Sequence, residues 1–318
     1  MNIVFMGTPS FSLPTLQQLY ESDHNVQLVV TQPDRPKGRG LESSYSPVKR
    51  FALEKGLPII QPEKLENLEV IHTLRNLNTD IFIIVAFGQI LKENLLNLPR
   101  HFCMNLHSSL LPKYRGAAPV NWAIINGETE TGVTTIKMNT GLDTGDILLT
   151  REVPIKSEDD AQSLADILAY KGAVLVLETL RQLDSGTLAP ISQDSSLSSY
   201  APKLKKEDGL IHWNKSALKI HNRVRGLSPW PGAFSFLGSK RFRIWKTETK
   251  AGIPLDQPGY IVRTTDRGIE VGTGSGRIIV TELQLEGKKR IDAKSFLAGY
   301  KLVDGSKFNN MPRLEVLS

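Results

Sequence analysis

Short apolar runs alternate with helical stretches through the first half of the chain. The runs are rich in Val, Ile and Phe and predict strands, at 3–6, 26–31, 57–60, 81–86 and 103–106. Between them, apolar residues at helical spacing predict helices, at 14–20, 47–54 and 71–76. This alternation is typical of parallel strands joined by helical crossovers. We therefore expect an α/β domain whose mostly parallel sheet has helices on both faces.

Two later segments extend the predicted sheet. β-Branched residues resume at 133–138 and 147–153 with a turn between them, and a long helix is expected at 159–183. The whole arrangement is Rossmann-like, and Gly7-Thr8-Pro9 follows the first strand where a dinucleotide-binding Rossmann domain carries its glycines. No G-x-G-x-x-G is present, which argues against a nicotinamide or flavin dehydrogenase.

The pattern changes beyond residue 185. Residues 186–206 are polar and rich in turn formers, which predicts a linker between a domain at 1–185 and one at 207–318. In the second domain one short helix at 215–225 precedes brief strands, at 233–237, 241–247, 259–264, 268–271 and 277–286. Short strands at close spacing favour a small β-barrel of the oligonucleotide-binding (OB) type.

A glycine cluster at 272–276 could be mistaken for a phosphate-binding loop. Such a loop needs a helix after it, so that backbone N–H groups and the helix dipole meet the anion. The residues that follow, Arg277-Ile278-Ile279-Val280, predict a strand instead. We expect a hairpin turn here.

Charge is divided unevenly along the chain. Residues 1–200 hold 17 Lys and Arg against 22 Asp and Glu, whereas residues 201–318 hold 22 against 11, so a net charge of +6 conceals −5 and +11. A compact basic domain is typical of proteins that hold a polyanion, most often a nucleic acid. A basic domain that is merely well solvated is the alternative.

The cellular setting follows from cysteine use and from hydropathy. The single cysteine, Cys103, cannot form an internal disulfide, and the chain begins with strand-like residues rather than a basic and then apolar leader. No apolar run approaches the roughly 20 residues that span a bilayer. We expect a cytoplasmic monomer without membrane contact.

The residues best suited to chemistry follow the strand at 103–106. Asn105 and His107 are two apart on an extended segment, so their side chains project from one face. An amide donor can stabilise a developing oxyanion, and an imidazole can exchange a proton near neutrality. Asp143, in a glycine-flanked loop between the later strands, could orient the imidazole, and Asp146 in the same loop is a rival.

Other kinds of catalysis have weaker support. A nucleophilic Ser108 or Ser109 would need a strand-to-helix elbow such as G-x-S-x-G, which is missing. Cys103 lies in an apolar strand, which favours a buried and inert thiol. The six histidines show no H-E-x-x-H and no cysteine pairing, so we expect no metal.

Several segments together resemble the folate-dependent formyltransferases. They cover most of the chain, in the order Met6-Gly7-Thr8-Pro9, Thr31 to Pro36, Asn105 to Pro119, Gly141 to Asp146 and Pro229 to Ala233. The resemblance implies transfer of the formyl group of 10-formyltetrahydrofolate to an amine. For this chain the implied acceptor is the α-amino group of methionine on initiator methionyl-tRNA, in translation initiation.

The resemblance also implies roles for individual residues. The Asn, His and Asp that surround the formyl group in that family correspond to Asn105, His107 and Asp143. The folate site would draw on a Ser-Leu-Leu-Pro element and on the segment after the fourth strand, that is, on Ser109, Leu110, Leu111, Pro112, Phe87, Gly88, Ile90 and Leu91.

A basic loop grips the acceptor stem in members of the family that act on tRNA. Residues 34–40 resemble that loop, and further cations in the second domain could contact phosphates. The expected tRNA contacts are Arg35, Lys37, Arg39, Lys203, Lys205, Lys206 and Arg223. Trp213, Trp230 and Trp245 lie among these cations along the chain and fit a core more readily than a base-stacking surface.

Two other functions stay open at this stage. A related formyltransferase acting on a small amine or an amino-sugar nucleotide would share the same three site residues. A nucleic-acid-binding protein without chemistry would not explain Asn105, His107 and Asp143 together.

Overall fold

The computed structural model describes residues 1–37, 42–43, 45–251 and 257–311. The chain divides into two compact units: unit 1 contains residues 1–119, 130–154 and 165–201, and unit 2 contains residues 120–129, 155–164 and 202–318. The domain boundaries expected at 185 and 206 stay a prediction. No helix within the described residues has both the length and the apolarity to cross a membrane.

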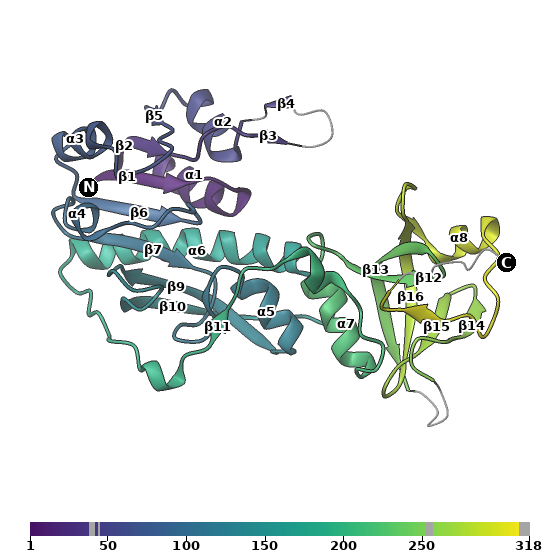
Figure 1. Cartoon of the computed structure of the whole chain (residues 1–318). Helices are drawn as coiled ribbons and strands as arrows, with labels where there is room; N and C mark the ends of the chain where they lie inside the picture. The colour runs from purple at the N-terminus through teal and green to yellow at the C-terminus, as the bar shows by residue number, and fades with distance from the viewer. Residues whose placement is uncertain (38–41, 44, 252–256, 312–318) are drawn as a thin grey trace. The chain divides into compact units, whose positions relative to one another are not determined.

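Unit 1 is built on a seven-stranded sheet (Figure 1). Its strands, in spatial order, are β10 (Asp146–Pro154), β9 (Glu130–Lys137), β7 (Cys103–His107), β6 (Ile81–Val85), β1 (Asn2–Gly7), β2 (Asn25–Val30) and β5 (Ile59–Ile60). The strands from β7 to β5 are parallel, while β9 and β10 join by antiparallel pairing. The mostly parallel sheet predicted from the sequence is therefore confirmed.

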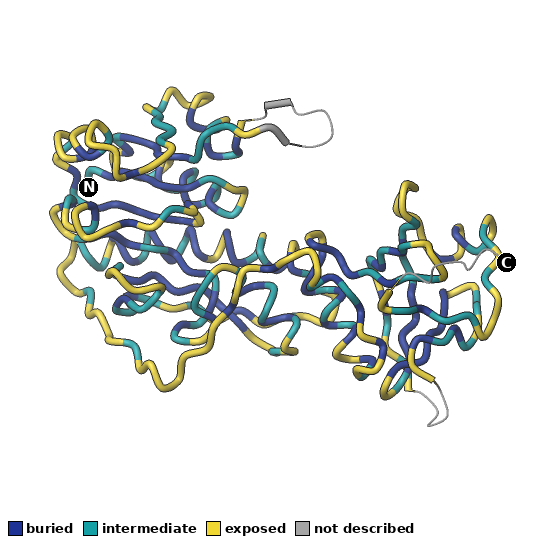
Figure 2. Tube along the Cα trace, viewed as in Figure 1, coloured by how far each residue is buried: buried dark blue, intermediate teal, exposed yellow. Residues whose placement is uncertain are grey.

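Helices cover both faces of this sheet, as the continuous burial of β1 and β6 requires. On β1, Val4 and Met6 pack with apolar residues of α3 (Leu68–Asn76) and α4 (Glu93–Leu96), while Ile3 and Phe5 are buried on the opposite face. The buried strands form the dark centre of unit 1 in Figure 2. The helices are α1 (Leu13–Glu21), α2 (Pro47–Glu54), α3 (Leu68–Asn76), α4 (Glu93–Leu96) and α6 (Ala161–Asp184).

Local sequence explains where these helices begin. Ser46 precedes α2 and its side chain accepts a hydrogen bond from the backbone N–H of Lys49, while Pro47 occupies the first helical turn. Asn67 caps α3 in the same way, through the N–H of Glu69. Gly172 lets α6 approach β7, because a Cβ there would lie 2.6 Å from the Leu106 side chain.

Two short strand pairs lie outside the main sheet of unit 1. One joins β3 (Pro36–Lys37) to β4 (Glu42–Ser43). The other joins β8 (Arg115–Gly116) to β11 (Tyr200–Ala201) in parallel, although β11 lies in the segment predicted to be a linker. The predicted linker is thus attached to unit 1 through residues 200–201.

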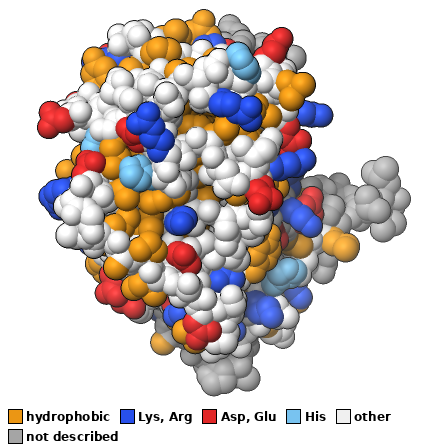
Figure 3. All heavy atoms as spheres, turned by 90° about the vertical axis from the view of Figure 1, so that its left-hand side faces the viewer, with side chains coloured by type: hydrophobic (Ala, Val, Ile, Leu, Met, Phe, Trp, Pro, Cys, Tyr) orange, Lys and Arg blue, Asp and Glu red, His pale blue; other side chains and the backbone are white. Residues whose placement is uncertain are grey.

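The surface of unit 1 beside α3 and α4 mixes both signs of charge. Figure 3 shows Lys and Arg interspersed with Asp and Glu on this face, with apolar side chains between them. Neither sign of charge is concentrated there, so this face shows no basic patch that would bind a polyanion.

Unit 2 contains an antiparallel sheet that closes on itself. Its main strands, in spatial order, are β14 (Ile261–Thr265), β15 (Gly268–Gly272), β16 (Arg277–Leu285), β13 (Lys240–Lys250), β12 (Ala233–Leu237) and β18 (Phe308–Asn309), and β17 (Ile291–Asp292) pairs with β16. Backbone hydrogen bonds between residues 259–261 and 305–308 join the two ends. The expected small β-barrel is confirmed, and residues 273–276 form the predicted turn between β15 and β16.

In its described part, unit 2 also contains the helices α5 (Pro119–Asn126), α7 (Ala217–Gly226) and α8 (Ala293–Gly299). The sequence predicted α7 but neither α5 nor α8. Within unit 2, the Asn121 side chain on α5 donates to the Gly226 carbonyl at the end of α7, at 2.7 Å. Trp213 lies in the core, 4% exposed and stacked on Phe308.

Candidate functional site

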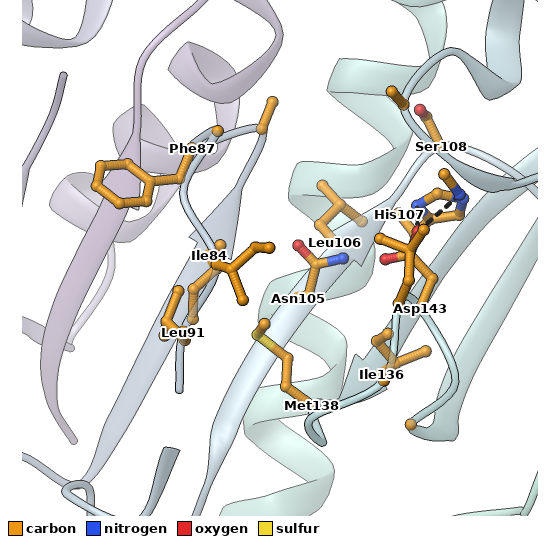
Figure 4. A pocket seen from close by; sticks show the side chains of 18 of the residues that line it. Ile84, Phe87, Leu91, Asn105, Leu106, His107, Ser108, Ile136, Met138 and Asp143 are labelled. Carbon is orange, nitrogen blue, oxygen red and sulfur yellow. Dashed lines mark hydrogen bonds and ion pairs between the residues drawn. The ribbon is translucent and has the colours of Figure 1, made fainter. Parts of the chain in front are cut away.

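Strand β7 directs Asn105 and His107 to one face of the sheet. Both pair with β9, Asn105 opposite Ile136 and His107 opposite Thr134. In Figure 4, Asn105 lies between the apolar side chains of Ile84 and Met138 on one side and His107 on the other. The period-two spacing of a strand thus places an amide and an imidazole side by side.

His107 is held by two neighbours. Its Nε2 lies 2.9 Å from the carbonyl oxygen of Tyr114, and its Nδ1 lies 3.6 Å from Oδ2 of Asp143. Because a carbonyl oxygen can only accept, Nε2 must carry a proton. The side chain is only 7% exposed, so the ring is fixed in orientation and Nδ1 faces the carboxylate.

Asp143 reaches this position from the loop between β9 and β10. Its backbone has φ = 52°, in the left-handed region that Asp tolerates better than most residues. The carboxylate Oδ2 accepts a hydrogen bond of 2.8 Å from the backbone N–H of Gly116. The same oxygen therefore faces both a backbone donor and the imidazole.

Asn105 differs from its neighbours because its amide is uncommitted. Within the described residues its side chain has no hydrogen-bonding partner, and it lines a cavity of about 610 Å³. An amide free on both its oxygen and its nitrogen suits a ligand that needs a donor at this point.

The cavity is mostly apolar around these polar groups. Phe87, Leu91, Ile136 and Met138 form its inner wall (Figure 4). At its mouth Ile90 and Leu142 are strongly exposed, at 81% and 56%. An apolar pocket with few convergent polar groups is typical of a small-molecule site.

Unusual backbone angles gather around this cavity. Besides Asp143, the non-glycine residues Ala86 and Tyr114 have φ of 47° and 60°. Ala86 lines the cavity and Tyr114 supplies the carbonyl that holds His107. Such conformations each cost roughly 1–3 kcal/mol and are concentrated at functional sites.

Metal binding finds no support in the part of the chain that the structure describes. Nowhere in it do three or more His, Cys, Asp or Glu side chains converge as a metal site would require.

Comparison with known proteins identifies the family. The family model "Formyl transferase" matches residues 1–180, and "Formyl transferase, C-terminal domain" matches residues 203–301. A methionyl-tRNA formyltransferase of Citrifermentans bemidjiense is 53% identical over 96% of this chain and 95% of its own. One of Geobacter sulfurreducens is 50% identical over 99% of both chains. The chain belongs to the formyl transferase family.

Solved structures agree on the fold. An N-formyltransferase of Helicobacter canadensis, crystallised with folinic acid and dTDP-3-aminofucose, matches this formyl transferase with a TM-score of 0.64. The match covers 87% of this chain and 98% of that one, at 20% identity. At that identity the likeness concerns the fold alone.

The residues expected at the folate site fall into two groups in this formyl transferase. Phe87, Gly88, Ile90 and Leu91 line the cavity, as do the three expected catalytic residues. Ser109, Leu110, Leu111 and Pro112 are not among its lining residues.

The second group instead builds the turn beneath the site. Ser109 is buried and its hydroxyl donates to the Lys113 carbonyl at 2.6 Å. Thr134 of β9 donates to the Ser109 carbonyl and accepts from the Leu111 N–H, at 2.7 and 3.2 Å. These bonds fix the backbone between His107 and Tyr114.

Two residues weighed as alternatives lie elsewhere. The Asp146 carboxylate accepts a hydrogen bond of 3.0 Å from the Ser192 hydroxyl and does not line the cavity. Cys103 is buried on β7 among apolar side chains, and burial raises the pKa of its thiol to about 12. Neither has the position or the state that catalysis requires.

The expected tRNA contacts are unequal in their surroundings. Arg35, Lys203, Lys205 and Lys206 are exposed. Arg223 is half-buried and donates to the carbonyl of Asp208, and burial lowers the pKa of its guanidinium. Arg39 and the side chain of Lys37 lie outside the described residues. Of the tryptophans, Trp213 is core, Trp245 is half-buried and Trp230 is 50% exposed.

Sequence reasoning missed several contributors to the site, among them Ile136 and Met138 of the inner wall, two backbone groups and Tyr200. The Tyr114 carbonyl and the Gly116 N–H are backbone groups, and their side chains give no signal of the role. Tyr200 lines the cavity from the segment predicted to be a linker.

Proposed function

We propose that this formyl transferase moves the formyl group of 10-formyltetrahydrofolate to the α-amino group of methionine on initiator methionyl-tRNA. The observation that carries the proposal is identity of 50% and 53% to methionyl-tRNA formyltransferases over nearly their whole length. The uncommitted amide of Asn105 beside the His107–Asp143 pair supplies the chemical means.

The cavity suits a folate-type formyl donor. Its apolar wall can take a flat ring system, and exposed Ile90 and Leu142 at the mouth would be covered by a bound ligand. When bound, 10-formyltetrahydrofolate supplies an activated formyl carbon. The chain's own residues then bind it, orient it and handle the charge and the proton.

Asn105 is assigned to the formyl oxygen. As the amine attacks the formyl carbon, negative charge develops on that oxygen, and the Asn105 amide can donate to it without first giving up another partner. Preorganised donors of this kind contribute about 10²–10³-fold in rate. No covalent bond to the protein is needed.

His107 and Asp143 are assigned to the proton. The attacking amine must lose a proton and the departing nitrogen must gain one. Since Nε2 of His107 is bonded to the Tyr114 carbonyl, Nδ1 is the nitrogen that exchanges a proton, and it does so beside the Asp143 carboxylate. The carboxylate stabilises the imidazolium when it forms.

The acceptor tRNA is assigned to basic residues in both units. Lys203, Lys205 and Lys206 are exposed and fit phosphate contacts, as do Arg35, Lys37 and Arg39 by their place in the sequence. Arg223, bonded to the Asp208 carbonyl, fits better as a support for the turn after Lys205. We also propose that the protein acts in the cytoplasm. We propose further that it is a monomer, and light scattering of the purified protein would test this.

A transfer assay tests this function. Purified protein with 10-formyltetrahydrofolate labelled in the formyl group should label initiator methionyl-tRNA, and uncharged tRNA is the control. Labelling of an amino-sugar nucleotide in place of the tRNA would favour the alternative acceptor. Binding of tRNA without any transfer would contradict an enzymatic role.

A further inference from the structure

The segment after α6 packs on the candidate site. At its start, Ile191 exchanges two backbone hydrogen bonds of 2.8 Å with Ile147 on β10. At its end, β11 pairs with β8, and the Ser199 hydroxyl accepts from the Tyr114 N–H at 2.9 Å. Residues 191–201, here called the strap, thus touch the two loops that carry Asp143 and Tyr114.

Gln193 makes the central contact of the strap. Its Nε2 donates to the carbonyls of Asp143 and Gly145, at 2.8 and 2.7 Å. Its Oε1 accepts from Nε and Nη2 of Arg115, at 3.1 and 2.8 Å. Of residues 191–200, all of which the structure describes, Gln193 alone is not exposed.

These four bonds link the loop that carries Asp143 to Arg115. Gln193 links the Asp143 backbone to Arg115, and the next residue, Gly116, donates its N–H back to the Asp143 carboxylate. The carboxylate in turn faces His107. The distance between Asp143 and His107 therefore depends on the position of a loop whose carbonyls are hydrogen-bonded to Gln193.

We propose that Gln193 is a positioning residue for formyl transfer, because its amide fixes the loop that presents the Asp143 carboxylate to His107. The kinetic test of this inference rests on the proposed function, whereas its hydrogen-exchange test does not. No role of this kind was expected for the strap, which the sequence indicated to be a linker.

Glutamine is the side chain that fits these four bonds. Only a primary amide of this length offers two donors and an acceptor together. Glutamate keeps the acceptor toward Arg115 but loses both donors, and would set a negative charge against two carbonyls. Methionine keeps the length and loses every hydrogen bond. The pair Gln193→Glu and Gln193→Met thus separates the Arg115 contact from the loop contact.

The first test is structural and needs no turnover. Amide hydrogen exchange of Gly116, whose N–H is bonded to Asp143, should speed at least about tenfold in both variants. Ser198→Ala is the matched control, because among the described residues its hydroxyl bonds only to the Ser195 carbonyl, within the strap. Exchange at Gly116 that is equal in all four proteins would overturn the proposal.

The second test is kinetic. Both Gln193 variants should lose about 10- to 100-fold in kcat, since small misplacements of catalytic groups cost that much, with KM for 10-formyltetrahydrofolate within about twofold. Ser198→Ala should keep wild-type kcat.

A double-mutant cycle separates positioning from general damage. With Asp143→Asn already present, Gln193→Met should cost little more, because both act through one carboxylate. Wild-type kcat in Gln193→Met, or fully additive losses, would overturn the proposal. Wild-type protein that fails to formylate methionyl-tRNA would instead contradict the proposed function, and the exchange at Gly116 would still decide whether Gln193 holds Asp143.

Discussion

Two residues on one face of β7 differ in how far the protein has committed them. His107 is fixed between the Tyr114 carbonyl and the Asp143 carboxylate. Asn105, two residues earlier, has no hydrogen-bonding partner for its side chain among the described residues. A polar group left unpaired beside an apolar cavity gains most from a ligand that supplies the missing bond.

Substitution of Asn105 should therefore affect the reaction more than the fold. We expect Asn105→Ala to lower kcat about 10²–10³-fold, since one oxyanion donor is removed. Asn105→Asp should lose at least as much, because a carboxylate of the same shape accepts hydrogen bonds and repels the oxyanion. Formyl transfer under saturating substrates measures kcat, and thermal melting should show both variants folded. A kcat within threefold of wild type would contradict the assigned role.

The sequence predicts that Asn105 and His107 share one face of a strand, as they do on β7, but gives no indication of Gln193. The first two share a strand, and a period of two is visible in the chain itself. Gln193 acts on the backbone carbonyls of Asp143 and Gly145, which every residue possesses. A contact that depends on carbonyls about 50 residues earlier in the chain leaves no pattern in one sequence.

At the scale of elements, β7 marks the change from parallel to antiparallel pairing. It is parallel to β6 and antiparallel to β9, so the loop after β9 leaves beside the start of β7 rather than its end. Met104 pairs with Lys137, yet Asp143 lies beside His107. The sequence analysis expected this loop to carry the acidic side chain, and the antiparallel pairing of β9 means that the loop must run back along β7 to bring Asp143 beside His107.

Strand β7 also carries a buried cysteine that does not line the cavity. Cys103 shares the face of Asn105 but is buried under α4, and burial raises the pKa of its thiol to about 12. Since only the thiolate reacts readily, native protein at pH 8 should resist alkylation by iodoacetamide and become labelled once unfolded. Mass spectrometry measures both states. Fast labelling of the native protein would show that this face opens.

The barrel of unit 2 contains a buried carboxylate, Glu270, whose pairing with three cations predicts a pH effect. Glu270 on β15 is 3% exposed and contacts Lys250, Arg263 and Arg277, at 2.8, 2.9 and 3.1 Å. Burial alone would raise the pKa of Glu270, but hydrogen bonds from Arg263, Lys250 and Arg277 lower it to about 2. The stabilisation is therefore present above the unfolded pKa, near 4.5, and is lost as the pH falls toward 2.

Glu270→Gln should thus destabilise unit 2 by about 3 kcal/mol near pH 7, because it removes the buried carboxylate charge whose pKa the three cations lower to about 2. The difference from wild type should shrink as the pH falls below about 4.5. All four tryptophans lie in unit 2, so their fluorescence reports its unfolding. Glu248→Gln is the control, since Glu248 pairs with Arg267 at the surface and should lose less than about 1 kcal/mol. A difference in unfolding free energy between wild type and Glu270→Gln that does not depend on pH would contradict the role assigned to Glu270.

Helix α5 shows why some elements escaped prediction. It begins at Pro119, a residue suited to a first helical turn, directly after the stretch that carries the site residues. Its apolar residues do not gather on one side, and Ala123 and Ile124 are both fully buried. A short helix without an amphipathic pattern cannot be told from a buried strand by periodicity.

At the scale of the whole molecule, the two ends of the chain carry opposite charge. Net charges of −5 over residues 1–200 and +11 over residues 201–318 favour a phosphate backbone near the second stretch. The exposed Lys203, Lys205 and Lys206 stand at its beginning, and no ion pair involves them within the described residues. Their charge is available to a polyanion.

Replacing these three lysines by alanine should weaken tRNA binding and change its salt dependence. Each phosphate contact releases counterions, so the slope of log K against log salt should fall by roughly 1 for each contact removed, about 3 in all. Binding titrations at several salt concentrations measure the slope.

The control for that experiment must match the change in net charge. Lys55, Lys64 and Lys171 are exposed residues of unit 1, and their replacement removes the same three charges. If the tRNA senses only net charge, both triple variants lose the same slope. A larger loss for Lys203, Lys205 and Lys206 means that phosphates lie against them, and an unchanged slope would remove them from the tRNA interface. Because we assign the chemical step to Asn105 and His107 instead, kcat at saturating tRNA should stay near wild type in both variants.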